Sequence, residues 1–169
     1  TAVRAFLAEG YRRPLCLHLP EGHLATTRRR QGLERACREA GLDPDSLEHC
    51  YMALGDEHYR DIPAVLLAHM QNGIPRFDAV ICGNDRIAFM VYQTLLGQGL
   101  RIPDDVAVIG YDNMVGIGEL FLPPLTTVQL PHYEIGRLSA LHIINGEEHQ
   151  ETTRVESPFL LRDSVAQAT

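Results

Sequence analysis

Two kinds of hydrophobic segment alternate along the chain. Short and nearly continuous apolar runs indicate buried strands, and longer segments with apolar residues three or four positions apart indicate helices. The expected strands are residues 14–19, 49–52, 77–82, 105–111 and 125–128, and the expected helices are residues 1–9, 26–40, 61–71, 84–96 and 133–144. Two short extended pieces are expected around Pro158. This alternation predicts an α/β fold in which a parallel, Rossmann-like sheet carries helices on both faces.

Small polar residues stand at the starts of two of these helices. Thr26 or Thr27 can cap the helix that begins there, and Asn84 or Asp85 can cap the helix that follows the 77–82 strand. The segment from 112 to 124 interrupts the rhythm and is expected to be a loop that ends in two prolines.

The composition is that of an ordinary globular protein, with 45% hydrophobic and 22% charged residues in a chain of 169. The net charge of −7 repels a phosphate backbone, and the triplet 28–30 is the one arginine block that stands out. These residues are therefore not expected to contact DNA directly. No leader pattern and no apolar run of about 20 residues is present, which favours the cytoplasm. Because Thr1 is not a natural start, we expect an N-terminal part to precede it.

Cysteines are scattered, without a C-x-x-C pair, at Cys16, Cys37, Cys50 and Cys82. His18 and His49 lie near cysteines in the sequence, but no second ligand pair at zinc spacing accompanies them. The spacing therefore indicates neither a metal site nor a thioredoxin-like motif. We expect the thiols to be structural groups in a reducing compartment.

Polar side chains follow the expected strands at their carboxyl ends. In an open parallel sheet these ends share one edge, where ligands bind. The candidate binding residues are Arg29, Glu57, Asn84, Arg86 and Asp112. Hydrogen-bonding groups of this kind suit a ligand rich in hydroxyl groups. The alternative is that Asn84 is only a helix cap and Asp112 only a turn residue, and position alone does not decide between the two.

Signatures of enzymes are missing from the sequence. Residues 116–121 begin like a dinucleotide-binding loop, but they lack the third glycine and lead into prolines instead of a helix. We find no G-x-S-x-G elbow, no phosphate-binding Walker loop and no H-E-x-x-H zinc motif. We therefore expect no catalytic residues and no cofactor.

Several separated blocks together resemble the LacI/GalR family of transcriptional regulators. They are FDAVICGND at 77–85, GLRIPDDVAVIGYD at 99–112 and PPLTTV at 123–128, with weaker matches at 10–13, 29–32, 134–136 and 161–164. Each block is weak alone, but their order and spacing agree over nearly the whole chain.

The resemblance implies a two-lobed domain like that of periplasmic binding proteins, behind a helix-turn-helix headpiece that binds operator DNA as a dimer. Residues 1–128 would be the second lobe, 129–158 a segment that crosses back to the first lobe, and 159–169 a terminal strand and tail. The headpiece and most of the first lobe would lie outside this chain.

The resemblance also assigns the effector contacts. Arg29, Asn84 and Asp112 match the family's contact positions, with Arg86 as a variable neighbour. The family often has an aromatic residue near Glu57, so the ligand face is expected to be more polar here. The effector would be a sugar, a sugar phosphate or a purine-like molecule, and Arg86 suggests an anionic or phosphorylated sugar.

A homodimer is the expected assembly. The helices at 61–71 and 87–96, which include Phe89 and Met90, and the segment 120–122 would form the interface. Phe121 and Leu122 are expected to be an exposed apolar patch that a partner covers, the alternative being that they tuck into their own lobe. The helix at 133–144 would bury its apolar face in the first lobe, and without that lobe we expect domain exchange or an atypical dimer.

The expected mechanism is allosteric: a bound effector stabilises one arrangement of the lobes, and the dimer transmits this bias to the headpieces. One rival is the periplasmic sugar-binding protein of a transporter, which would have a leader peptide and no headpiece upstream. The other is an α/β enzyme, which would need a nucleophile or a metal constellation at the strand ends, and the sequence shows neither.

Overall fold

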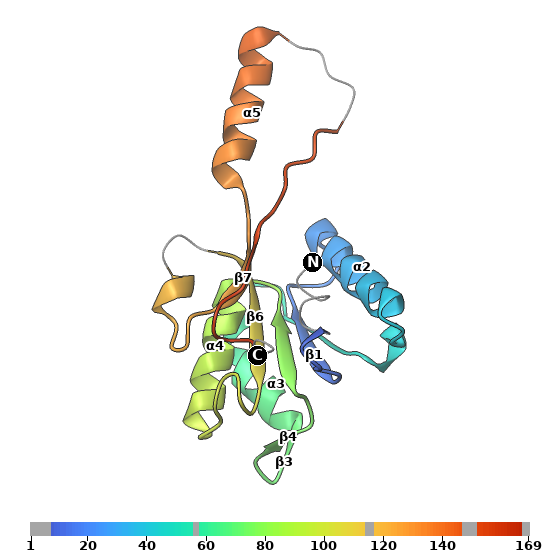
Figure 1. The fold of residues 1–169 in the computed structure, drawn as a ribbon, viewed down its shortest axis with the longest axis vertical. Coiled ribbons are helices and arrows are strands. Elements are labelled where there is room, and N and C mark those ends of the chain that lie inside the picture. The colour runs from blue at the N-terminus through green and yellow to red at the C-terminus, as the bar shows by residue number, and fades with distance from the viewer. Residues whose placement is uncertain (1–7, 56–57, 114–116, 147–151, 167–169) are drawn as a thin grey trace.

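The computed structural model describes residues 8–55, 58–113, 117–146 and 152–166, and its centre is a six-stranded sheet (Figure 1). The strands are β1 (Pro14–His18), β2 (Glu48–Tyr51), β5 (Ala79–Cys82), β6 (Ala107–Asp112), β7 (Thr126–Gln129) and β8 (Phe159–Leu160), in the order β2-β1-β5-β6-β7-β8. Every neighbouring pair is parallel except β7 and β8, which are antiparallel. The α/β prediction is confirmed, with one antiparallel strand at the edge.

Within the described residues, four α-helices surround or leave the sheet. They are α2 (Leu24–Glu39), α3 (Ile62–Ala68), α4 (Asp85–Gly97) and α5 (His132–Asn145). Short 3-10 turns occupy Pro44–Ser46, His58–Asp61 and Gly118–Leu120. The expected helix at 1–9 lies largely outside the described residues, as does the first glycine of the 116–121 loop.

Side chains of the buried strands alternate between two hydrophobic layers. Leu15 and Leu17 of β1 pack with Val80 and Val108 in the layer covered by α3 and α4. Cys16 points to the opposite face, where it packs with Leu33 and Cys37 of α2 and with alanines of β5 and β6. This alternation follows from the period of two in a strand, and both layers are apolar because helices cover both faces.

The helix α2 begins two residues earlier than the sequence predicted. Its N-cap is His23, without a side-chain cap, so Thr26 and Thr27 lie inside the first turn and the predicted threonine cap is wrong. Starting at Leu24 places Thr26 on the buried face of the helix, where only 3% of its surface is exposed. Burial of this helix face, and not capping, therefore determines where α2 begins.

The segment after α3 is a hairpin and not the end of a longer helix. The strands β3 (Met70–Gln71) and β4 (Ile74–Pro75) pair antiparallel through a turn at Asn72 and Gly73. Both turn residues have positive φ, of 51° and 78°, and an Asn-Gly pair favours this hairpin turn. The prediction of helix as far as Gln71 is therefore wrong.

The helix α5 stands away from the rest of the molecule in Figure 1. None of its residues is buried, and Tyr133, Ile143 and Ile144 are about four-fifths exposed, at 83%, 81% and 77%. Gly146 ends the helix in the left-handed conformation. No described residue of the chain buries the apolar side chains of α5, and the domain exchange predicted for this helix stays a prediction. Among the described residues, no helix is both long and apolar enough to cross a membrane.

Candidate functional site

Arg29 and Asp112 meet at the carboxyl edge of the sheet. Arg29 lies in the second turn of α2, and its Nη2 atom is 3.7 Å from Oδ1 of Asp112, the last residue of β6. The same guanidinium donates a hydrogen bond to the carbonyl oxygen of Gly83 and lies 3.8 Å from the ring centroid of Tyr111. The arginine is thus fixed by a carboxylate, a carbonyl and an aromatic face.

The backbone at Asp112 is constrained. Its φ is 109°, a conformation that non-glycine residues rarely adopt, and the next residue, Asn113, also has positive φ. Strain of this kind is common at functional sites. The Asp112 carbonyl accepts a hydrogen bond of 3.1 Å from the backbone of Leu130, just before α5.

The electrostatic environment of Asp112 combines opposing influences. Burial raises the pKa of Asp112, and the Asp85 carboxylate acts in the same direction. Arg29, His132 and Arg86 lower that pKa, but less than burial and Asp85 raise it. The carboxylate is therefore partly desolvated and still lies near two arginine side chains.

Asn84 has two structural partners. Its side-chain oxygen accepts a hydrogen bond of 2.9 Å from the backbone N–H of Ile87. Asn84 is therefore the N-cap of α4, as the sequence predicted. Its amide nitrogen donates to the Tyr59 hydroxyl at 3.1 Å. Only 9% of Asn84 is exposed, so a ligand would meet a side chain that is already held in place.

The two remaining candidates differ. Arg86 is exposed in the first turn of α4, and its effect on Asp112 shows that it lies on the same side of the site. Glu57 lies outside the described residues. The structure thus brings four of the candidates to one edge of the sheet. Arg29 lies in the helix after β1, Asn84 and Arg86 follow β5, and Asp112 ends β6.

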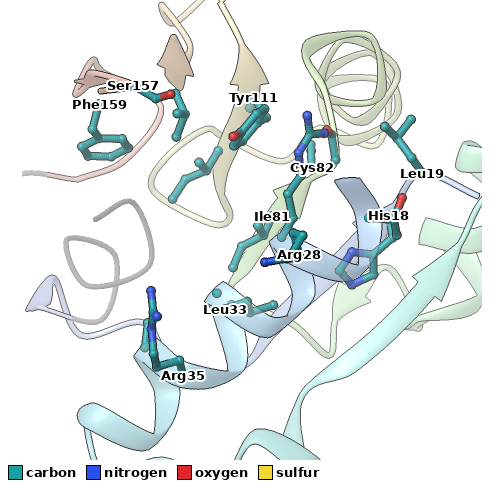
Figure 2. Close-up of a pocket in the computed structure, with 18 residues that line it drawn as sticks. His18, Leu19, Arg28, Leu33, Arg35, Ile81, Cys82, Tyr111, Ser157 and Phe159 are labelled. Carbon is teal, nitrogen blue, oxygen red and sulfur yellow. The ribbon is translucent and has the colours of Figure 1, made fainter. Parts of the chain in front are cut away.

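A cavity of about 370 Å³ lies beside this cluster (Figure 2). His18, Arg28, Tyr111 and Phe159 are among its lining residues, which come from β1, α2, β6 and β8. Arg29 lines the cavity, whereas Asn84, Arg86 and Asp112 do not. Most of the wall is apolar, so the polar cluster at the strand ends fits a hydroxyl-rich ligand better than the cavity does.

One polar group in the cavity wall has unused hydrogen-bonding capacity. The Thr26 hydroxyl is buried and has no hydrogen-bond partner within the described part of the chain. Buried polar atoms nearly always have a partner, so this hydroxyl is available to a water or ligand in the cavity.

Three further residues at this edge were missed by sequence reasoning. Tyr59 holds Asn84, Tyr111 supports Arg29, and Gln129 pairs with Asp112 in the register of β6 and β7. Gln129 ends β7 and Tyr111 is the residue before Asp112 in β6, so their place at the carboxyl ends of strands is the same signal that identified Asp112. Tyr59 is an aromatic residue two positions after Glu57, and the expectation of a more polar ligand face stays a prediction.

The expected exposed patch is only partly exposed. Phe121 is 8% exposed and packs edge-on against Tyr92, with ring centroids 4.8 Å apart, so its predicted exposure is wrong and the alternative for it is right. The aromatic cluster of Phe89, Tyr92 and Phe121 explains why it turns inward. Leu122 is 82% exposed and Phe89 is 50% exposed, while Met90 is half-buried against the core.

Comparison with known proteins agrees with this fold. The family described as periplasmic binding proteins and sugar binding domain of LacI family matches residues 1–163. The sucrose operon repressors of Escherichia coli and Shigella flexneri are each 58% identical over 164 residues, which is 97% of this chain and 50% of the relative. The ribose operon repressor of Escherichia coli strain K12 is 32% identical, over 98% of this chain and 49% of the relative.

Solved structures show the same architecture. A LacI family transcriptional regulator from Enterococcus faecium with bound ribose has a TM-score of 0.81 and 29% identity, covering 98% of this chain and 60% of that one. The chain spans about half the length of the curated relatives it matches. On the strength of the fold, the separated sequence blocks and these matches, the chain belongs to the LacI/GalR family, within its periplasmic-binding-protein-like, effector-binding part.

Proposed function

We propose that this chain is the effector-binding part of a sugar-responsive repressor. The observation that carries the proposal is the cluster of Arg29, Asp112 and Asn84, in which a cationic fork, a carboxylate and an amide converge. A carboxylate can accept hydrogen bonds from two neighbouring hydroxyls, and an arginine can donate to a sugar oxygen. Ligands without such groups would make fewer hydrogen bonds with these partly buried side chains and bind less well.

The proposed effector comes from the chemistry of sucrose. Two relatives that are 58% identical are named sucrose operon repressors, so sucrose, its constituent hexoses and their phosphate esters are the first candidates. The cluster favours an anionic member of this group, because the side chain of Arg29 lies 3.7 Å from Asp112 and the charge of Arg86 also acts on Asp112. The proposal of a phosphorylated or acidic sugar therefore rests on Arg29 and Arg86.

The proposed mechanism couples this site to DNA binding elsewhere in the protein. Asp112 is hydrogen-bonded to Leu130, and α5 begins two residues later. An effector that favours one position of Asp112 would therefore also favour one position of α5. Operator binding would belong to a headpiece outside this chain. The names of the curated relatives favour this reading over a transporter's periplasmic binding protein.

A thermal-shift and calorimetry panel tests the effector proposal. It would contain sucrose, glucose, fructose, their phosphate esters, ribose and a purine, each added to the purified protein. We expect a sugar phosphate to give the largest shift and the lowest Kd, since it can pair with the arginines. A neutral sugar that binds more tightly than its phosphate contradicts the anionic preference. Binding of the purine alone contradicts the sugar proposal.

We further propose a homodimer whose interface includes the exposed side chains around the aromatic cluster of Phe89, Tyr92 and Phe121. Leu122 and Phe89 lie on it, and Phe121 supports it from beneath. Replacing Leu122 with Asp places a charge in the proposed interface, so we expect the dimer dissociation constant to rise at least about tenfold. Sedimentation velocity over a concentration series measures this, with the exposed Leu54→Asp as the matched control. Equal constants for both variants would contradict this interface.

A further inference from the structure

Three potential metal ligands from two neighbouring strands lie together, although they are far apart in the sequence. Cys16 and His49 are partners in the parallel register of β1 and β2, and His18 follows Cys16 by two residues on the same face of β1. The ligand atoms of these three side chains all lie within 4.8 Å of one another. The Nε2 atom of His18 is 2.8 Å from the Nδ1 atom of His49.

The ligand atoms lie within 4.8 Å of one another, so both the thiol and the imidazoles would have to shift before they could hold one small divalent ion. Zinc binds imidazole nitrogen at about 2.0 Å and thiolate sulfur at about 2.3 Å, which puts two tetrahedral nitrogen ligands about 3.3 Å apart. The two imidazole rings would have to separate by about half an ångström from their present 2.8 Å. His49 is only half-buried, so its ring has room to make this movement.

Neighbouring aromatic side chains hold the two imidazole rings. The His18 ring stacks on His49 and on Tyr51, with centroids 5.0 Å apart in both cases. A second cavity, of about 340 Å³, is lined by Tyr51, Arg30 and Glu34. Arg30 and Glu34 are joined by a 2.6 Å ion pair.

We propose that Cys16, His18 and His49 form a binding site for one Zn²⁺ ion, with water as the fourth ligand. Two imidazoles and one thiolate are a ligand set that zinc accepts, and three protein ligands with one open position is a common zinc arrangement. Spacing along the sequence gave no sign of this site, because its ligands are paired across strands. The site lies at the β1 and β2 edge, and His18 also lines the cavity beside Arg29.

Cobalt titration of the chelator-treated protein tests the site directly. Co²⁺ replaces Zn²⁺ and gives a thiolate-to-metal absorption band in the near ultraviolet. We expect this band to saturate at one Co²⁺ per chain and to disappear on addition of one equivalent of Zn²⁺. Cys16→Ala should abolish the band, and His49→Gln should weaken Co²⁺ binding at least about tenfold.

Matched variants separate this site from other thiols and histidines. Cys82→Ala removes a buried thiol from the opposite layer, and His23→Gln removes an exposed histidine. Both should bind Co²⁺ like the parent protein. The proposal is overturned if the parent shows no band, if Cys16→Ala keeps it, or if His49→Gln and His23→Gln bind equally well. Should Cys16→Ala fail to fold by circular dichroism, the comparison of the two histidine variants decides.

Discussion

Replacing Arg29 with Ala is expected to weaken binding of the preferred sugar by about 100-fold. The substitution removes a charged hydrogen-bond donor, and loss of such a bond costs about 1.5–3 kcal/mol. It also leaves Asp112 without its 3.7 Å partner, so the carboxylate no longer has a fixed position. Isothermal titration with the tightest ligand of the sugar panel measures the change in Kd.

Two further variants sharpen this test. Arg29→Lys keeps the charge but loses the planar fork over Tyr111, so its affinity should fall between those of the parent and Arg29→Ala. Arg38→Ala is the control, because Arg38 lies on the same helix but pairs with Glu34 on the surface. If Arg29→Ala and Arg38→Ala bind the sugar equally well, Arg29 is not an effector contact.

Replacing Gly110 with Ala is expected to cost about 3 kcal/mol of folding free energy, through overpacking and damage to a buried hydrogen bond. A Cβ atom at this position of β6 would overlap Oδ1 of Asp85 and lie 2.8 Å from Cδ2 of Leu125. Both neighbours are fully buried, and Asp85 also accepts a 2.8 Å hydrogen bond from Thr127. Since the crowding breaks or strains this pair, the midpoint of thermal unfolding should fall by about 10 °C.

The matched control for this substitution is Gly32→Ala. Gly32 lies within α2, and a Cβ atom there would meet nothing within 4 Å. Alanine in a helix interior is favoured over glycine by about 1 kcal/mol, so this variant should melt at or slightly above the parent temperature. Equal melting temperatures for both alanine variants would show that β6 accommodates the extra carbon and would contradict the predicted overlap with Asp85.

The order of strands and helices could be predicted from hydrophobic periodicity, and so could the meeting of Arg29 with Asp112. Parallel strands put their carboxyl ends at one edge, which makes residues after different strands neighbours. The limits of α2 could not be predicted in this way, because burial of Thr26 outweighed its preference for a cap. The hairpin at 70–75 contains the pair Asn72-Gly73, which favours a hairpin turn. The helical spacing of apolar residues in α3 continues into this segment and led to the prediction of a longer helix.

Side-chain contacts between different helices, strands and turns could not be predicted from the sequence pattern. Phe121 sits in a loop-like stretch, and its burial depends on the position of Tyr92 on another element. The pairing of Cys16 with His49 depends on strand register, which residue spacing does not reveal. Tyr59 reaches Asn84 only because the turn before α3 lies beside the start of α4.

The two residues before Pro131, at the start of α5, are held by contacts with other segments. Gln129 is bonded to Pro158 on one side and paired with Asp112 on the other, and Leu130 is bonded to the Asp112 carbonyl. These contacts lie just before α5, a projecting helix of 14 residues, which at about 1.5 Å per residue is roughly 20 Å long. A tilt of a few degrees where α5 begins would move its far end by more than an ångström, so a shift at Asp112 that reached Leu130 would be larger at that end.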